Sequence, residues 1–281
     1  MAILSIQSAV AYGHVGNSAA VFPLQRLGHE VWPIDTVQFS NHTGYGALRG
    51  RVWDPGTIAE IVRGIGERGA FRSCEAVLSG YLGEVALGEI VLDAVAAAKA
   101  ANPAALYCCD PVIGDDRSGV FVRPGIAEFF RDRALPAADI ATPNCFELGL
   151  LAGTAIAGPH DALAAARQLG RRGPRLLLVT SLAGPVNGQI AMLAVTEEQA
   201  WLTATPRLPI SVDGAGDLTA ALFLGNYLRD RDAAAALAAT TASVFATIDA
   251  TERSGERELQ LIMAQDALVA PPRRFAVTPF P

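Results

Sequence analysis

The residues of this sequence best suited to chemistry form the tetrapeptide Gly214-Ala215-Gly216-Asp217, directly before a helical pattern that begins near Leu218. Backbone N–H groups at a helix start face outward without partners, with the positive end of the helix dipole behind them. Glycines let a phosphate approach such a backbone closely. Asp217 would stand at the mouth of this anion hole, where a carboxylate can deprotonate an alcohol. A plain tight turn with Asp217 as helix N-cap would explain the same residues, so both interpretations stay open here.

Carboxylates also follow two predicted strands. Asp110-Pro111-Val112-Ile113-Gly114-Asp115 comes directly after one apolar run, and Thr142-Pro143-Asn144-Cys145-Phe146-Glu147 follows the next, with Glu147 at a helix start. Ligands gather at the carboxyl ends of strands in open parallel sheets. Separated carboxylates there suit magnesium, which keeps waters and substrate phosphates among its ligands. Turn or capping chemistry would explain either segment alone, but together with an anion hole they favour a nucleotide site.

A third group combines hydroxyls, an imidazole and aromatic rings. Ser8 ends the first predicted strand, and the later loops Asn41-His42-Thr43-Gly44-Tyr45 and Ser79-Gly80-Tyr81-Leu82-Gly83 supply the rest. Aromatic faces with a few oriented polar groups suit a flat heteroaromatic ligand. A histidine in such a loop is more often structural than catalytic, so we assign His42 a positioning role at most.

The hydrophobic pattern predicts a sheet that could hold these groups. Short apolar runs rich in β-branched residues indicate strands, and longer segments with helical spacing lie between them. The predicted strands are Ala2–Ile6, Glu30–Ile34, Ala76–Ser79, Leu106–Cys109, Asp139–Thr142, Leu176–Thr180 and Ile190–Val195. The predicted helices include Pro55–Arg68, Leu87–Lys99, Gly125–Arg133 and Asp161–Arg171. Alternating strands and helices predict an α/β fold with a mainly parallel sheet covered on both faces.

The C-terminal third has a different pattern. After Trp201 we expect a proline-containing loop to Val212, then helices through about Ile248 and again over Glu256–Leu268, and an irregular tail over Ala270–Pro281. The chain contains no internal repeat and no Gly/Ser linker. We therefore expect its 281 residues to form a single domain, 1–281.

Composition and charge exclude several classes of function. The chain has 22 basic and 28 acidic residues, a net charge of −6, and no basic run, so we expect no nucleic-acid partner and no membrane partner. The N-terminus lacks the pattern of a signal peptide, and no apolar run approaches the ~20 residues needed to cross a bilayer. The cysteines show neither a zinc-like spacing nor a disulfide framework, which favours the cytoplasm. They are Cys74, Cys108, Cys109 and Cys145.

In this order, the motifs make the sequence similar to pyridoxal kinases of the ribokinase-like superfamily, over nearly the whole chain. The motif Gly214-Ala215-Gly216-Asp217 is common to the wider superfamily, and the two N-terminal motifs carry the vitamin B6 assignment. The motifs are Ser5-Ile6-Gln7-Ser8 with Tyr12-Gly13-His14-Val15-Gly16-Asn17, Val37-Gln38-Phe39-Ser40-Asn41-His42-Thr43-Gly44-Tyr45, Leu78-Ser79-Gly80-Tyr81-Leu82-Gly83, Cys109-Asp110-Pro111-Val112-Ile113-Gly114, Thr142-Pro143-Asn144 and Gly214-Ala215-Gly216-Asp217.

This resemblance implies a three-layer α/β/α sandwich, usually a homodimer, that transfers the γ-phosphoryl group of ATP to the 5′-hydroxyl of pyridoxal. It implies that Asp217 is the base within the Gly214, Ala215 and Gly216 anion hole, and that Asp116–Val122 is a lid over ATP. Substrate contacts would come from Ser8, Thr43, Gly44, Tyr81 and Asp217. ATP contacts would come from Asp110, Thr142, Glu147, Thr180, Ser181, Thr205, Pro206, Arg207 and Leu208. Asp110, Asp115, Thr142 and Glu147 would organise Mg²⁺ and a monovalent cation, K⁺ or Na⁺.

Some positions differ from part of the family, and rival functions remain at this stage. Many bacterial members have Lys where Thr180 aligns and Gln where Gly44 aligns, whereas other members, including animal enzymes, have Thr and Gly. A hydroxymethylpyrimidine or sugar kinase would share the anion hole but need a different pocket. A protein that binds pyridoxal 5′-phosphate without catalysis would not need Asp217 and the acidic cluster. An interaction protein on the same fold is a third possibility, because one fold hosts many functions.

Overall fold

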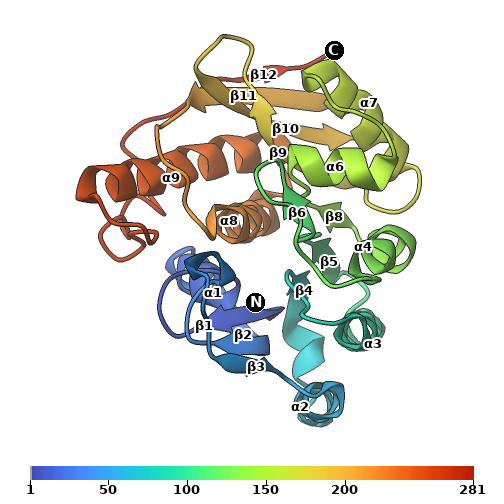
Figure 1. Ribbon diagram of the computed structural model, residues 1–281. Helices are drawn as coiled ribbons and strands as arrows, with labels where there is room; N and C mark the ends of the chain where they lie inside the picture. Colours follow the sequence, from blue (N-terminus) through green and yellow to red (C-terminus); the bar gives the residue numbers. More distant parts are fainter. Residues whose placement is uncertain (1) are drawn as a thin grey trace.

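The computed structural model describes residues 2–281 and contains one ten-stranded sheet, in the order β12-β11-β10-β9-β8-β5-β4-β1-β2-β3 (Figure 1). The strands of this sheet are β1 Ala2–Val10, β2 Glu30–Phe39, β3 Gly50–Val52, β4 Cys74–Ser79, β5 Leu106–Cys109, β8 Ile140–Ala141, β9 Leu176–Ala183, β10 Gln189–Thr196, β11 Ala200–Pro206 and β12 Val277–Pro279. Pairing is parallel from β2 to β9 and antiparallel at both edges. A separate hairpin joins β6 Gly114–Asp115 to β7 Gly119–Val120.

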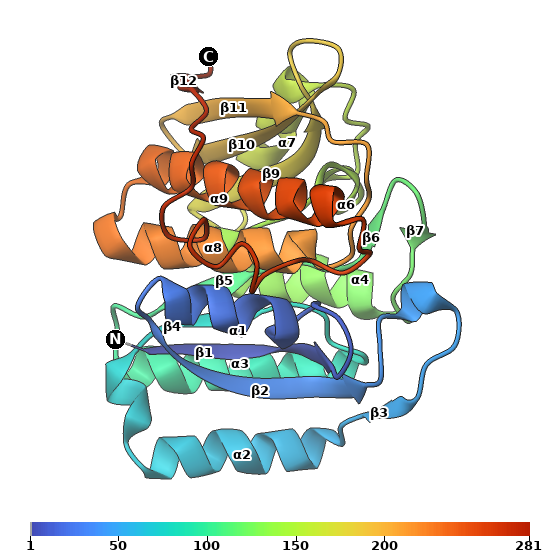
Figure 2. The same cartoon turned by 90° about the vertical axis from the view of Figure 1, so that its left-hand side faces the viewer.

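Helices cover both faces of the sheet, as Figures 1 and 2 show. Helices α1, α8 and α9 supply buried residues to one hydrophobic cluster, and α2, α3, α4, α6 and α7 supply them to the other. Their bounds are α1 Asn17–Arg26, α2 Pro55–Glu67, α3 Val85–Ala101, α4 Ile126–Phe129, α5 Leu135–Ala137, α6 Cys145–Ala152, α7 Pro159–Gly170, α8 Ala215–Asp230 and α9 Ala233–Ser254. Short turns of other helix types are η1 Thr43–Tyr45, η2 Ala70–Ser73 and η3 Phe130–Ala134.

The two clusters explain why the central strands read as continuous apolar runs. Along β4, Val77 packs into one cluster while its neighbours Ala76 and Leu78 pack into the other. A strand that is buried on both faces needs apolar side chains at every position. The predicted three-layer α/β/α arrangement with a mainly parallel sheet is confirmed.

Three expectations for the C-terminal third are wrong. Trp201–Thr205 belongs to strand β11 rather than to a loop, because it pairs with β10. Glu256–Leu268 forms successive turns instead of a helix: Gly255 ends α9 at a positive φ of 71°, and the following chain turns so that its leucines enter a third hydrophobic cluster. Val277–Pro279, within the tail that we expected to be irregular, pairs with β11.

One helix also corrects the expectation about apolar runs. Within residues 2–281, α9 is the helix whose length and composition would allow it to cross a membrane. In this structure 56% of the relevant window is buried inside the protein, where α9 packs on β10, β11 and α8. Such burial is typical of a core helix. All four cysteines are free.

Candidate active site

A cavity of about 700 Å³ lies at the carboxyl ends of the parallel strands. Its volume is in the range of small-molecule sites. Every site residue predicted from the sequence lines it, although these residues come from segments spread between β1 and α8. They are Ser8, Thr43, Gly44, Tyr81, Asp110, Asp115, Thr142, Glu147, Thr180, Ser181, Thr205, Pro206, Arg207, Leu208, Gly214, Ala215, Gly216 and Asp217.

The anion-hole motif opens helix α8. Gly214 is its N-cap at a φ of 84°, and no side chain caps the helix start. Gly214 has to be glycine because a Cβ there would collide with the backbone carbonyl oxygen of His14. Asp217 lies in the first turn rather than at the N-cap, so the N-cap interpretation of Asp217 is wrong. The first N–H groups of α8 therefore have no side-chain cap, and uncapped N–H groups of this kind can bind an anion.

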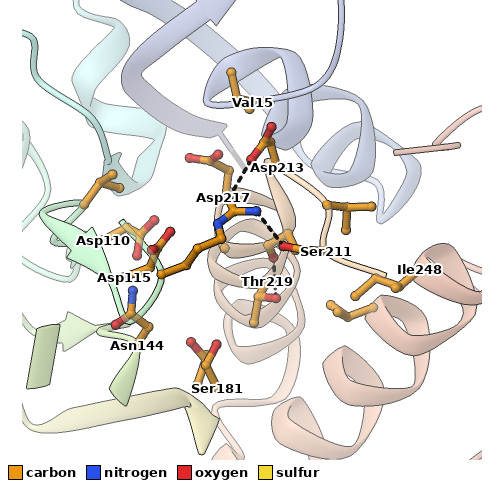
Figure 3. Close-up of a pocket in the computed structure, with 18 of the residues that line it drawn as sticks. Val15, Asp110, Asp115, Asn144, Ser181, Ser211, Asp213, Asp217, Thr219 and Ile248 are labelled. Carbon is orange, nitrogen blue, oxygen red and sulfur yellow. Dashed lines mark hydrogen bonds and ion pairs between the residues drawn. The ribbon is translucent and has the colours of Figure 1, made fainter. Parts of the chain in front are cut away.

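Three carboxylates with raised pKa values lie around this helix start: Asp110 and Glu147 are buried, and Asp217 is half-buried. Burial raises the pKa of Asp110 well above its usual value, and the nearby Glu147 and Asp217 raise it further. Burial raises the pKa of Glu147 to about 7. It also raises the pKa of Asp217, against a backbone hydrogen bond from Gly16. Figure 3 shows Asp110, Asp115 and Asp217 in the pocket.

Hydrogen bonds hold two of these carboxylates in place. Thr142 donates to Asp110 at 2.7 Å. Glu147 forms a capping box with Asn144 at the start of α6, and its Oε1 also accepts from the N–H of Ile113 at 2.8 Å. The Glu147 oxygens are therefore already engaged with the backbone. Glu147 is therefore suited to holding the backbone after β5 in place and to binding a cation through a bridging water.

The donor set fits a divalent cation that takes some of its ligands from the protein and the others from a substrate and water. Within residues 2–281, no three His, Cys, Asp or Glu side chains converge closely enough to hold a metal by themselves. Magnesium often binds through one or two carboxylates and completes its shell with water and phosphate oxygens. Clustered buried carboxylates with raised pKa values are the environment in which an added cation relieves charge repulsion.

The opposite side of the cavity carries the loop with Thr43 and Gly44. His42 Nδ1 lies 3.0 Å from Asp213 Oδ2 and 3.2 Å from the backbone nitrogen of Gly44. One imidazole nitrogen cannot donate to the first and accept from the second at once. We favour donation to Asp213, since this contact is shorter and involves a carboxylate. The hydrogen bond from His42 lowers the pKa of Asp213.

The predicted lid, Asp116–Val122, contains the turn and the second strand of the β6–β7 hairpin. Its Arg117 donates to Ser211 Oγ at 3.2 Å and lies 3.6 Å from Asp213 Oδ1. The hairpin thus contacts the loop that leads into the anion hole (Figure 3). Sequence reasoning missed Asp213, although it directly precedes the glycine motif. It also missed Arg117, which falls inside the lid segment, and the α9 residues Thr241, Val244, Phe245 and Ile248, whose pattern gives no sign of a ligand.

The predicted nucleotide side combines strand ends and one unusual backbone position. Thr180 at the end of the parallel part of β9 is buried, and its N–H donates to Pro143 O at 3.1 Å. Ser181 has a positive φ of 59°, which is uncommon for a residue other than glycine. Strained positions of this kind often occur at functional sites. Thr205 and Pro206 end β11, and Arg207 follows them.

Comparisons with known proteins agree on a family. The protein-family model described as phosphomethylpyrimidine kinase matches residues 69–261. The pyridoxal kinase PdxY of Rubrobacter xylanophilus is 60% identical over 279 residues, covering 98% of this chain and 96% of the relative. That of Leifsonia xyli is 51% identical and covers 99% of each chain. The structure of pyridoxal kinase from Leishmania donovani with ADP and pyridoxamine is 30% identical, with a TM-score of 0.94 over 100% of this chain and 99% of that one.

The parallel sheet covered by helices on both faces, with the uncapped start of α8 at its strand ends, is the architecture of the ribokinase-like class of kinases. More specifically, the chain belongs to the pyridoxal kinase family. The family assignment made from the sequence motifs is confirmed.

Proposed function

We propose that this protein transfers the γ-phosphoryl group of Mg-ATP to the 5′-hydroxyl of pyridoxal, and of related B6 pyridines, to give pyridoxal 5′-phosphate. The observation that carries this proposal is the placement of Asp217. It is a half-buried carboxylate in the first turn of α8, in the same cavity as the loop carrying Thr43 and Gly44. Close relatives are named pyridoxal kinases, and one family member was solved with ADP and pyridoxamine.

In the proposed reaction Asp217 is the general base. Its raised pKa brings it closer to neutrality, where a base is most effective at accepting a proton. The 5′-hydroxyl would donate its proton to Asp217 while its oxygen attacks the γ-phosphorus. The bond to the leaving β-phosphate oxygen would break as the new bond forms. The N–H groups of Gly214, Ala215 and Gly216 would hold the phosphoryl oxygens, so that positioning and electrostatics supply most of the rate increase.

Binding roles follow the two sides of the cavity. Ser8, Thr43, Gly44 and Tyr81 would contact the pyridine substrate. The ATP would lie against Thr180, Ser181 and the segment Thr205–Leu208, under the Asp116–Val122 lid. Because Ser8 lies near the carboxyl end of β1 and Thr180 near that of β9, the two ligands would approach from opposite parts of the sheet edge.

The metal proposal follows from the acidic cluster. Asp110, Asp115, Thr142 and Glu147 would hold Mg²⁺ and a monovalent cation, K⁺ or Na⁺, partly through water. Bound magnesium supplies charge neutralisation on the β- and γ-phosphoryl oxygens. Burial raises the pKa of Asp110, and repulsion by Glu147 and Asp217 raises it further, which supports a cation at this place.

Three further proposals concern the whole chain. We propose that residues 1–281 act as one domain, which the single continuous sheet supports. The homodimer is carried over from the family resemblance, and light scattering on the purified protein tests it. The cytoplasmic location rests on the cysteine pattern of the sequence.

The experiment that tests the function measures pyridoxal 5′-phosphate by its absorbance, with ATP, Mg²⁺ and K⁺ present. Asp217→Asn should lower kcat by roughly 10² to 10⁴, the usual contribution of a positioned base, and leave the ATP affinity nearly unchanged. Near-normal turnover by Asp217→Asn would remove this residue from the role of base. No product with any B6 pyridine would contradict the proposed function.

A hydroxymethylpyrimidine kinase is the second candidate, because the matching family model is described as phosphomethylpyrimidine kinase. The same assay with hydroxymethylpyrimidine as the acceptor separates the two. A higher kcat/KM for the pyrimidine than for pyridoxal would favour this alternative.

A further inference from the structure

The substrate loop, residues 42–45, is poorly anchored by its own packing. None of the η1 residues Thr43–Tyr45 is buried. Yet Thr43 and Gly44 line the cavity, so the position of this loop sets one wall of the proposed pyridine pocket. Contacts that fix it must come from elsewhere in the chain.

Glu258, which lies more than 200 positions later in the sequence, binds this loop directly. Its Oε1 accepts a hydrogen bond from the Tyr45 hydroxyl at 2.6 Å. Its Oε2 accepts one from the backbone N–H of His14 at 3.0 Å. The carboxylate packs so closely on Gly13, which has a φ of 97°, that a Cβ there would collide with it. One side chain therefore joins the substrate loop to the loop after β1.

Arg257 binds the same loop from the neighbouring position. Its guanidinium donates to the carbonyl oxygen of Gly44 at 2.9 Å and lies 3.8 Å from the centre of the Tyr45 ring. It also donates to Asp213 at 3.4 Å, the carboxylate that contacts His42. A planar guanidinium, with five donors in a fixed geometry, can bind a carbonyl and a carboxylate while its face lies on an aromatic ring.

The segment that carries Arg257 and Glu258 is firmly packed against the protein. Leu259 and Leu261 are fully buried against Leu218 and Leu222 of α8. The N–H of Gln260 donates to Thr251 at 3.0 Å, which ties the segment to the end of α9. In Figure 2 the chain after α9 runs back beside α8 and α1. A rigid base carrying two polar side chains is the arrangement expected of a positioning element.

We propose that Arg257 and Glu258 are positioning residues for the pyridine substrate: they fix the 42–45 loop so that Thr43 and Gly44 face the pocket. This inference rests on the proposed function, since it assigns the loop to the B6 substrate. Neither residue lines the cavity, so both act through the loop. Their loss should weaken use of pyridoxal and leave the nucleotide side of the site unchanged.

The test compares Glu258→Ala, Arg257→Ala and Glu258→Gln with the matched control Glu256→Ala, a neighbouring exposed glutamate. We expect Glu258→Ala to raise KM for pyridoxal by roughly tenfold or more, the usual effect of losing hydrogen bonds to a charged group. KM for ATP should stay within about twofold. Glu258→Gln keeps one acceptor oxygen for the His14 N–H, and its amide can donate to the Tyr45 hydroxyl oxygen, so it should recover part of the loss. Glu256→Ala should match the wild type.

A second readout measures hydrogen exchange of peptides covering 39–50 in the protein without substrate. Exchange should be faster in Glu258→Ala than in the wild type, and the melting temperature should change little. Unchanged exchange together with an unchanged KM for pyridoxal would overturn the proposal. So would an equal rise of both KM values with a lower melting temperature, because that pattern indicates general damage. Tyr45→Phe, which leaves Glu258 in place, should reproduce part of the pyridoxal effect.

The two readouts separate this inference from the proposed function. If the wild type phosphorylates no B6 pyridine, the proposed function fails, and the exchange measurement still decides whether Glu258 fixes the loop. If the wild type is active and Glu258→Ala behaves like it in both measurements, the inference fails alone.

Discussion

Alanine at Gly214 should cost stability and activity, whereas alanine at Gly216 should cost activity alone. Gly214 has a φ of 84°, and a Cβ there would collide with the His14 carbonyl oxygen. The left-handed backbone costs roughly 1–2 kcal/mol for a residue with a Cβ, and relief of the collision costs roughly 1–3 kcal/mol more. We therefore expect the free energy of unfolding of Gly214→Ala to fall by about 2–5 kcal/mol.

Gly216 offers the matched contrast two residues later. It has helical geometry within α8, and a Cβ there would meet no atom within 4 Å. Replacing a helical glycine with alanine stabilises by up to ~1 kcal/mol. The open space is the cavity itself, so the added methyl group would keep the phosphoryl oxygens away from the backbone. Losing a donor to a charged transition state costs roughly 10²–10³ in kcat, and we expect Gly216→Ala to fall in this range.

Urea unfolding and steady-state kinetics on both variants decide the matter. The expected pattern is a lower midpoint for Gly214→Ala, an equal or higher midpoint for Gly216→Ala, and low kcat for both. Wild-type kcat in a stable Gly216→Ala would refute the placement of the phosphoryl group at this helix start. Wild-type stability of Gly214→Ala would refute the tight packing of His14 on the motif.

Three more predictions concern charge. Because burial raises the pKa of Asp217 and the base acts ionised, kcat/KM for pyridoxal should rise with pH through a value above the ordinary range of an aspartate; the pH–rate profile checks this, and Asp217→Asn should lose that limb. Burial raises the pKa of Glu147 from 4.5 to about 7, so the metal-free folded protein holds this proton more tightly than the unfolded chain. This group therefore contributes on the order of 3 kcal/mol to the free energy of unfolding below about pH 4.5. That contribution is lost as the pH rises to about 7. Mg²⁺ should therefore raise the melting temperature more at pH 7.5 than at pH 5.5, and equal shifts would contradict a metal at this cluster. Arg117→Ala should speed hydrogen exchange of the β6–β7 hairpin and raise KM for ATP by no more than about fivefold, since an exposed ion pair contributes roughly 0–1 kcal/mol; unchanged exchange would show that the contact with Asp213 does not hold the lid.

The sequence predicts the parallel centre of the fold well because its signals there are local. Runs such as Leu106–Cys109 and Leu176–Val179 are apolar at every position, as strands buried on both faces must be. Glycine, proline and carboxylate residues follow directly after these strands in the sequence. The carboxyl ends of parallel strands necessarily lie at one edge of the sheet. This is why every predicted site residue lines one cavity.

The edges of the fold are harder to predict because pairing partners decide them. Trp201–Thr205 carries a strand-like alternation, but the prolines at 206 and 209 suggest a loop until β10 is placed beside it. Glu256–Leu268 has helix-forming composition, yet burial of Leu259, Leu261 and Leu268 in the third cluster overrides that propensity. Arg257 and Glu258 contact the substrate loop only because the chain turns at this point, which the local sequence does not predict.

The acidic cluster around the start of α8 explains how stability and function oppose each other in this protein. Asp110, Glu147 and Asp217 all have raised pKa values because burial disfavours their charged forms. A sequence selected for stability alone would place apolar or neutral side chains there, and violations of this kind mark functional sites. A cation bound among these carboxylates removes the repulsion, and a ligand that binds the folded state alone stabilises it by mass action. The proposed metal and nucleotide would therefore order the site and stabilise the fold through the same charges that make the empty site unfavourable.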